Sequence, residues 1–254
     1  MNNPVFWALW AGLGTWFVTA AGAGTVIFLP HRQQRFLDAL LGFSAGVMIA
    51  ASFWSLLQPA ALQAASGTIP PWLVLTLGFC IGAGSMRLAD RLAIHIYPGI
   101  EKQKTLLLLS ITLHNIPEGL AIGVAFGALK PGDPEGLAAA ISIAVGIGLQ
   151  NFPEGAAVAL PLRRNGTSRW KSFLAGQASA LVEPVASAAG AILVTQVKML
   201  LPWALSFAAG AMILVAVHEL IPECQQDREE QSYHSTGGII AGFAIMTMLD
   251  VMLG

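Results

Sequence analysis

Two short segments of the sequence carry the same arrangement of polar residues around a proline. They read His-Asn-Ile-Pro-Glu-Gly at 114–119 and Gln-Asn-Phe-Pro-Glu-Gly at 150–155. Residues three and four positions apart share one face of a helix, so the first, second and fifth side chains of each segment converge. These side chains are His114, Asn115 and Glu118 in one segment and Gln150, Asn151 and Glu154 in the other. Imidazole, carboxylate and amide groups suit a borderline divalent cation, so the repeat predicts a metal site between two helices.

Several carboxylates lie inside apolar runs that contain no lysine or arginine. Glu118, Glu154, Glu183 and Glu219 each fall within such a run, and Glu223 lies at the end of the last one. An ionised carboxylate in hydrocarbon costs at least ~2.5 kcal/mol, so a proton or an imported cation must supply the missing positive charge. The neighbouring imidazole and amides favour a metal cation.

Two further residues are candidates for the same site. Glu183 precedes Pro184, which places a carboxylate beside a kinked backbone and predicts a third wall of the site. Met48 lies in a stretch of small residues, where a methionine is usually a core residue, and we consider it a candidate metal contact. A simple proline kink with a neutral acid remains the alternative for Glu183.

A third polar segment, His218 to Glu223, nearly matches the zinc-protease motif His-Glu-x-x-His. Pro222 stands where the second histidine must be, so the second zinc ligand is missing and the protease interpretation fails. We predict instead that His218, Glu219 and Glu223 line a transport route or take up protons, with ordinary packing as the alternative.

The elements that position these residues are apolar runs. The chain has 254 residues, of which 55% are hydrophobic and 11% are charged. A membrane-spanning helix needs about 20 apolar residues, and eight runs approach or exceed that length. They cover approximately 6–29, 37–58, 72–92, 105–129, 137–162, 172–197, 199–222 and 237–253. The sequence therefore predicts one all-α integral membrane domain over 1–254, in which helices 4 and 5 form an inverted-repeat-like pair carrying the metal site. Hydropathy alone leaves seven or nine spans open.

The basic residues predict the orientation in the membrane. All but two of the 13 lysines and arginines, namely Lys130 and Lys198, fall in or beside the odd-numbered loops. Because basic loops stay in the cytoplasm, both termini are expected outside it. The net charge of −1 leaves no basic field for nucleic acid, so the bilayer is the expected environment and no nucleic-acid partner is expected.

The paired segments and the eight runs resemble the ZIP (Zrt/Irt-like protein) family of divalent-metal transporters, in its bacterial, GufA-like branch. The resemblance implies a binuclear metal centre. One ion is expected at His114, Glu118, Gln150 and Glu154, with Met48 as a candidate further ligand. The second ion is expected at Asn115, Glu118, Asn151, Glu154 and Glu183. The resemblance also implies a homodimer and an elevator-like movement of spans one, four, five and six against the rest.

The leading functional hypothesis is transport of Zn²⁺, or of Fe²⁺, Cd²⁺ or Mn²⁺, into the cytoplasm across a bacterial inner membrane. The protein is then not an enzyme, and the metal is cargo rather than a cofactor. Many relatives carry histidine where this chain has Gln150, so this position is expected to bear on selectivity. Two alternatives remain open from the residues alone, a proton-coupled carrier of an organic solute and an intramembrane metallohydrolase.

Overall fold

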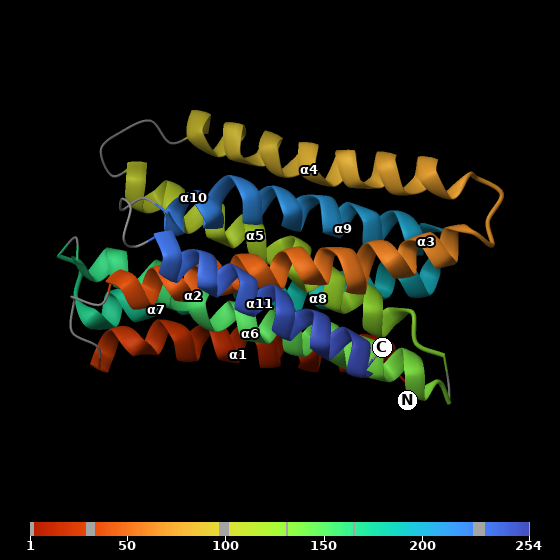
Figure 1. The fold of residues 1–254 in the computed structure, drawn as a ribbon, viewed down its shortest axis with the longest axis horizontal. Coiled ribbons are helices and arrows are strands. Elements are labelled where there is room, and N and C mark those ends of the chain that lie inside the picture. The colour runs from red at the N-terminus through yellow and green to blue at the C-terminus, as the bar shows by residue number, and fades with distance from the viewer. Residues whose placement is uncertain are drawn as a thin grey trace.

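The chain folds into long helices that lie side by side in a bundle (Figure 1). The computed structural model describes residues 3–28, 34–96, 102–130, 132–164, 166–225 and 232–253. Within these ranges some side chains lie outside the description, chiefly those of 93–96 and 102–111 and that of His114. No strand occurs in the described ranges. The helices are α1 (Pro4–Phe28), α2 (Gln34–Ala51), α3 (Gln58–Ala64), α4 (Pro71–Ile96), α5 (Lys102–Gly127), α6 (Pro134–Arg164), α7 (Arg169–Ser179), α8 (Val182–Gln196), α9 (Leu201–Val215), α10 (Ile221–Cys224) and α11 (Ser232–Leu253).

Seven helical segments in the described ranges are long and apolar enough to cross a membrane. They are Pro4–Phe28, Arg35–Ala64, Pro71–Ala89, Pro134–Arg163, Arg169–Gln196, Leu201–Cys224 and Tyr233–Met252. They match seven of the predicted spans, and the all-helical, multi-pass membrane class is confirmed. The fourth predicted span, 105–129, coincides with helix α5, but most side chains in the first half of α5 lie outside the described part of the chain. The count of eight therefore stays a prediction.

Prolines explain where the helices depart from regular α geometry. Two π-helical turns, η1 (Ser52–Leu57) and η3 (Ala216–Leu220), end just before Pro59 and Pro222. A proline cannot donate a backbone hydrogen bond and crowds the carbonyl four residues earlier, and a π turn absorbs that mismatch. The predicted second span ended at residue 58, whereas the helix continues through η1 and α3 to Ala64. The predicted sixth span was continuous, whereas the helix breaks between α7 and α8, just before Pro184.

The helices divide into two bundles by their main packing partners. In the site-bearing bundle, which comprises α1, α5, α6, α7 and α8, helix α1 packs chiefly on α6 and α8, and α5 packs chiefly on α8. In the flanking bundle, which comprises α2, α3, α4, α9, α10 and α11, helix α2 packs chiefly on α11, and α4 on α9. The boundary is formed mainly by α2 against α6 and by α5 against α9.

Glycines allow very close backbone approach inside each bundle. A Cβ added at Gly22, Gly123, Gly155, Gly82 or Gly242 would overlap a backbone carbonyl oxygen of the neighbouring helix. The first three glycines join α1 to α6 and α5 to α8, and the last two join α4 to α9 and α2 to α11. Small residues at these positions let transmembrane helices pack backbone to backbone.

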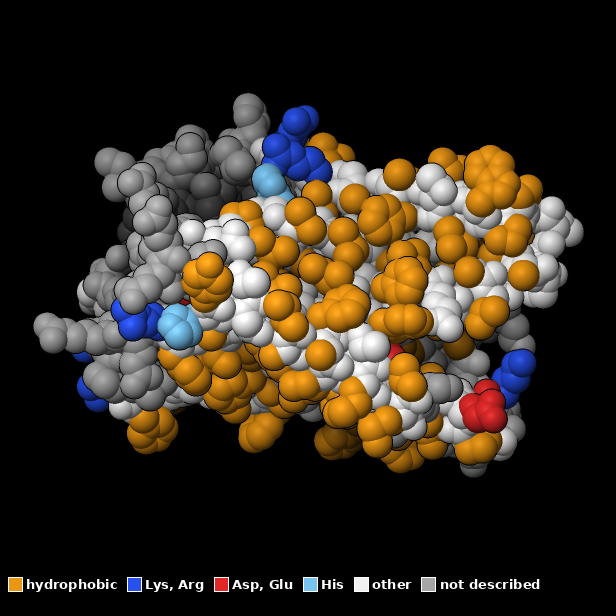
Figure 2. Space-filling view, viewed as in Figure 1, with side chains coloured by type: hydrophobic (Ala, Val, Ile, Leu, Met, Phe, Trp, Pro, Cys, Tyr) orange, Lys and Arg blue, Asp and Glu red, His pale blue; other side chains and the backbone are white. Residues whose placement is uncertain are grey.

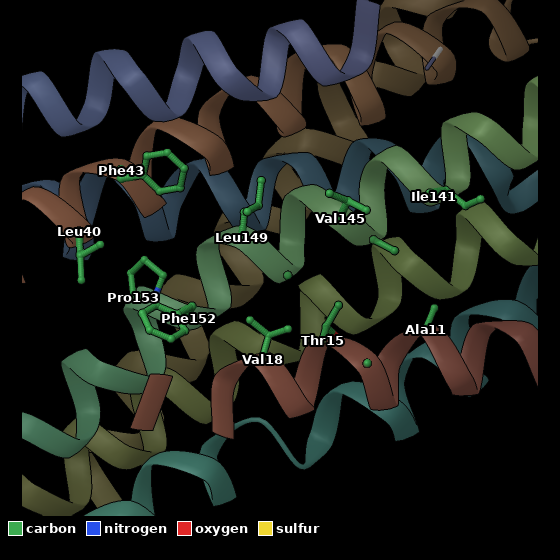
Figure 3. A pocket seen from close by; sticks show the side chains of 13 residues that line it. Ala11, Thr15, Val18, Leu40, Phe43, Ile141, Val145, Leu149, Phe152 and Pro153 are labelled. Carbon is green, nitrogen blue, oxygen red and sulfur yellow. The ribbon is translucent and has the colours of Figure 1, made fainter. Parts of the chain in front are cut away.

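The boundary between the bundles is packed differently. Among the described glycines, the one that faces the other bundle is Gly146 on α6, and it meets the Met246 side chain on α11 rather than a backbone. In addition, an apolar groove of about 670 Å³ opens between α1, α2 and α6. Figure 3 shows Phe43 from α2 facing Val145 and Leu149 from α6 across this groove. The boundary thus consists of side chains and open apolar space.

The surface agrees with a membrane setting. In Figure 2 hydrophobic side chains cover most of the face shown, and the charged ones lie mainly towards its two ends. Large apolar side chains such as Phe17, Trp72 and Val185 are more than half exposed. Both chain termini lie at the same end of the bundle (Figure 1), as an even number of crossings requires.

Candidate metal centre

The polar residues of the paired segments are buried where α5, α6 and α8 meet. Exposure is at most 6% for the five whose side chains are described, Asn115, Glu118, Gln150, Asn151 and Glu154, and Glu183 of α8 is fully buried beside them. Both helices stay helical through their prolines, Pro117 on α5 and Pro153 on α6. The helical spacing predicted that these side chains lie close together, and the structure brings the described ones into one buried cluster.

A hydrogen bond joins the two segments directly. Gln150 Nε2 on α6 donates to Glu118 Oε1 on α5 over 2.6 Å. A carboxylate acceptor makes such a bond shorter and stronger than a neutral pair does. The hydrogen bond therefore holds Gln150, the first residue of the α6 segment, against Glu118, the fifth residue of the α5 segment.

Glu183 is held by two side chains and by its position at the start of a helix. Asn151 Nδ2 lies 2.8 Å from its Oε1 and 2.9 Å from its Oε2, and Thr15 Oγ1 donates to Oε2 over 2.5 Å. Glu183 occupies the first turn of α8, after the helix break at Leu181. A helix N-terminus carries partial positive charge, which stabilises a carboxylate there. The helix break thus places Glu183 against Asn151 of the α6 segment, and its role as the third wall of a metal site stays a prediction.

Glu154 is bound from across the bundle boundary. Ser44 on α2 donates from Oγ to Glu154 Oε1 over 2.8 Å. The Ser44 Oγ also lies 3.3 Å from the Gln150 carbonyl oxygen. Sequence reasoning missed Ser44 and Thr15. The available signal was a hydroxyl residue inside an apolar run, which is too common to single out either one.

Asn115 ties the cluster to the break between α7 and α8. Its Nδ2 donates over 3.1 Å to the carbonyl oxygen of Ser179, the last residue of α7. One turn along α5, Gly119 packs so closely that an added Cβ would lie 2.6 Å from the Glu183 carbonyl oxygen. The α5 segment is therefore clamped to both sides of the break.

Three buried oxygens in the cluster have no hydrogen-bond partner among the described residues. They are Glu118 Oε2, Gln150 Oε1 and Asn151 Oδ1. Buried polar atoms without partners are uncommon, and each one calls for an explanation. Carboxylate and amide oxygens carry lone pairs and can accept a cation. The donor set therefore fits a divalent metal through oxygen ligands.

The described side chains do not by themselves form a site of three acidic, histidine or cysteine ligands. No group of three or more such residues within the described part of the chain is arranged to hold a metal ion. Carboxylate–amide hydrogen bonds hold the cluster together instead. The imidazole of His114 lies outside the described side chains, so its predicted role as a ligand stays a prediction.

Met48 is fully buried in the main hydrophobic cluster, together with Ile122 and Ile147. Its own carbonyl oxygen accepts a 2.7 Å hydrogen bond from Ser52 Oγ. This environment is that of a core residue, and the contact of Met48 with a cation stays a prediction.

The third polar segment lies in the flanking bundle, on η3 and α10. His218 Nε2 faces Arg87 Nη1 of α4 at 3.1 Å, and both side chains are exposed. A guanidinium only donates hydrogen bonds, so Nε2 acts as the acceptor in this pair. Glu219 is half-buried and Glu223 is exposed. The segment from His218 to Glu223 therefore lies in the flanking bundle, whereas the paired segments lie in the site-bearing bundle.

The fold and the cluster define a multi-pass membrane protein whose interior carries buried carboxylates and amides that are suited to a cation. The sequence model of the family described as "ZIP Zinc transporter" matches residues 103–250. The human protein named Zinc transporter ZIP11 is 35% identical, over 100% of this chain and 99% of its own length. Zinc transporter ZIPB of Bordetella bronchiseptica is 37% identical, over 98% of this chain and 82% of its own length.

A third relative, Zinc transporter GufA of Myxococcus xanthus, is 42% identical over 59% of this chain and 56% of its own length. The chain belongs to the ZIP family of zinc transporters. The predicted resemblance is confirmed. Because this is a family of transporters, the metallohydrolase alternative is set aside.

Proposed function

We propose that this protein transports divalent metal cations, zinc foremost and iron, cadmium or manganese as further substrates, into the cytoplasm. The observation that carries the proposal is the group of unpartnered buried oxygens on Glu118, Gln150 and Asn151. No lysine or arginine is present in the described cluster to balance its carboxylates, so the balancing charge is assigned to the cargo. The zinc transporters named among its relatives support the same substrate class.

The proposed centre holds two ions that share the glutamates of the paired segments. The first is assigned to His114, Glu118, Gln150 and Glu154, with Met48 as a candidate ligand. The second is assigned to Asn115, Glu118, Asn151, Glu154 and Glu183. The hydrogen bond from Gln150 to Glu118 and the double contact of Asn151 with Glu183 support this pairing, because each brings together groups assigned to one ion.

For the transport movement we propose that the site-bearing bundle slides against the flanking bundle. Backbone-to-backbone glycine contacts favour this division, because they tie helices together within each bundle. The side-chain contact of Gly146 with Met246 and the open groove at the boundary favour it too, because such contacts can be exchanged more easily. His218, Glu219 and Glu223 are assigned to the route or to proton uptake.

We place the protein in the inner membrane of a bacterium, as a homodimer with both termini outside the cytoplasm. The position of both termini at one end of the bundle supports an even number of crossings. The concentration of basic residues in odd-numbered loops supports the stated orientation.

Purified protein in liposomes tests the proposal. Zn²⁺ offered outside, with and without excess Fe²⁺, Cd²⁺ or Mn²⁺, should accumulate inside protein-containing vesicles and not inside empty ones. Competition among these ions supports a shared metal site. Organic-solute uptake with a proton, and no metal uptake, would favour the second candidate, a proton-coupled carrier.

A further inference from the structure

One hydrogen bond of the cluster crosses from one bundle to the other. Ser44 lies on α2 in the flanking bundle, and Glu154 lies on α6 in the site-bearing bundle. Ser44 Oγ is 2.8 Å from Glu154 Oε1 and 3.3 Å from the Gln150 carbonyl oxygen. Ser44 is fully buried and Glu154 is 6% exposed, so water does not compete freely for this bond.

The comparison with Thr15 shows what is particular to Ser44. Both hydroxyls bind a carboxylate of the cluster, at 2.5 Å for Thr15 with Glu183 and 2.8 Å for Ser44 with Glu154. Thr15 lies on α1 and Glu183 on α8, inside the same bundle. Movement of one bundle against the other leaves the Thr15 bond intact and breaks the Ser44 bond.

We infer that Ser44 is a positioning residue that latches the flanking bundle to a cation-binding glutamate and releases it when the cation binds. The inference rests on the proposed function, because it assigns Glu154 to the cation. Glu154 Oε1 accepts the hydrogen bond from Ser44 through a lone pair. A divalent cation bound to Glu154 draws on the lone pairs of the carboxylate oxygens and so weakens the bond that Ser44 donates.

Occupancy of the site is thereby linked to the freedom of the two bundles to move. Without a cation, Glu154 Oε1 holds the Ser44 hydroxyl, and the arrangement in which this bond joins the two bundles is favoured. When a cation is bound, this bond is weaker and the joined arrangement is less favoured. A ligand can shift such an equilibrium only through a difference in its interaction with the two states, and the Ser44–Glu154 bond supplies one.

A crosslink across the bundle boundary measures this arrangement. Gly146→Cys together with Met246→Cys places two thiols at the contact between α6 and α11, and the shorter side chain at 246 makes room for the new Cβ at 146. The natural thiols are first removed by Cys80→Ala and Cys224→Ala. A bifunctional methanethiosulfonate reagent then reports the fraction of molecules in this arrangement, with and without Zn²⁺.

In this parent protein, crosslinking should be strong without Zn²⁺ and should fall as Zn²⁺ saturates. Adding Ser44→Ala should lower the zinc-free ratio of crosslinked to free protein roughly tenfold, because a buried hydrogen bond between the bundles is lost. It should also abolish the response to Zn²⁺. Ser44→Thr, which keeps the hydroxyl, should restore the parent behaviour.

Ser52→Ala is the matched control. Ser52 is fully buried and continues the same helical run as Ser44, but its hydroxyl donates to the Met48 carbonyl oxygen of its own helix. Removal of the Ser52 hydroxyl should leave crosslinking at the parent level both with and without Zn²⁺. Parent-like, zinc-responsive crosslinking in the Ser44→Ala protein would overturn the inference.

Zinc uptake separates the latch from the proposed function. The Ser44→Ala protein should still accumulate Zn²⁺, since Ser44 is not assigned as a ligand; a loss as complete as that of Glu154→Ala would overturn the inference. If the unmodified protein takes up no metal at all, the proposed function fails. The difference in crosslinking between the Ser44→Ala and Ser52→Ala proteins without Zn²⁺ would still report whether the Ser44–Glu154 bond holds the bundles together.

Discussion

Gln150 and Glu118 are 2.6 Å apart through Nε2 and Oε1, and this one hydrogen bond joins the two repeated segments. The amide nitrogen donates to the carboxylate, while the amide oxygen, Oε1, has no partner among the described residues. Gln150 therefore donates to the glutamate and keeps an oxygen that is able to accept a cation. The paired segments act as one unit rather than as two separate sites.

The shared glutamates should be indispensable for transport. Glu118→Ala or Glu154→Ala should abolish zinc uptake in liposomes, because each removes a ligand from both proposed ions. Western blotting of the membrane fraction and a monodisperse elution profile are the controls for insertion and folding. Near-normal uptake by either variant would reject the bridging assignment.

Glu183→Ala should weaken uptake less than either of those changes, since Glu183 is assigned to the second ion alone. Thr15→Val is a useful companion, because it removes the 2.5 Å hydrogen bond to Glu183 and keeps the carboxylate. We expect Thr15→Val to raise the KM for Zn²⁺ and to leave maximal uptake nearly unchanged. Greater damage from Glu183→Ala than from Glu118→Ala would reverse the proposed ranking of the two ions.

External pH should control the apparent affinity for zinc. The carboxylates and His114 must lose their protons before they can bind a metal, so protons compete with the cation. The KM for Zn²⁺ should therefore rise as the outside is acidified from about pH 7.5 to about pH 5. Uptake is measured with the internal pH held constant. A constant KM over this range would argue against a His/Glu site.

Labelling from each side should report the orientation. In a background without Cys80 and Cys224, Thr167→Cys should react with an impermeant maleimide only from the cytoplasmic side. Glu135→Cys, at the start of α6, should react only from the outside. Intact and inverted membrane vesicles give the two sides. The opposite pattern would overturn the orientation derived from the basic loops.

Gln150→His should shift selectivity towards zinc. An imidazole provides a nitrogen ligand, which suits Zn²⁺ better than the harder Mn²⁺. Its other ring nitrogen can still donate a hydrogen bond to Glu118. We expect tighter Zn²⁺ binding and slower turnover, because a tighter site releases its ion more slowly. Competitive uptake of Zn²⁺ against Mn²⁺ measures the shift, and an unchanged preference would mean that Gln150 does not contact the selected ion.

The helices and the composition of the cluster were predictable because both depend on local patterns. Apolar runs define the spans, and helical spacing places Asn115 beside Glu118 and Asn151 beside Glu154. The proline before each glutamate did not break α5 or α6, whereas Pro184 lies in the first turn of α8, directly after the break between α7 and α8. The difference depends on the packing around each proline, which local sequence does not describe.

Ser44 and Thr15 could not be predicted for a related reason. Each comes from a helix outside the paired segments, and its role depends on how that helix packs against α6 or α8. The hydrogen bonds from these residues span more than 100 positions in sequence, 110 for Ser44 to Glu154 and 168 for Thr15 to Glu183. No spacing rule reaches across such distances.

The close glycine contacts have a consequence for genetics. At Gly22, Gly123 or Gly155 even an alanine methyl group would meet a neighbouring backbone oxygen, although none of these residues is assigned to the cargo. A screen of random mutants for lost metal uptake should therefore recover such glycines alongside the glutamates. The two groups would differ in abundance: mutants at the glutamates would accumulate as inactive protein, and those at the glycines would be removed by proteases before they reach normal levels.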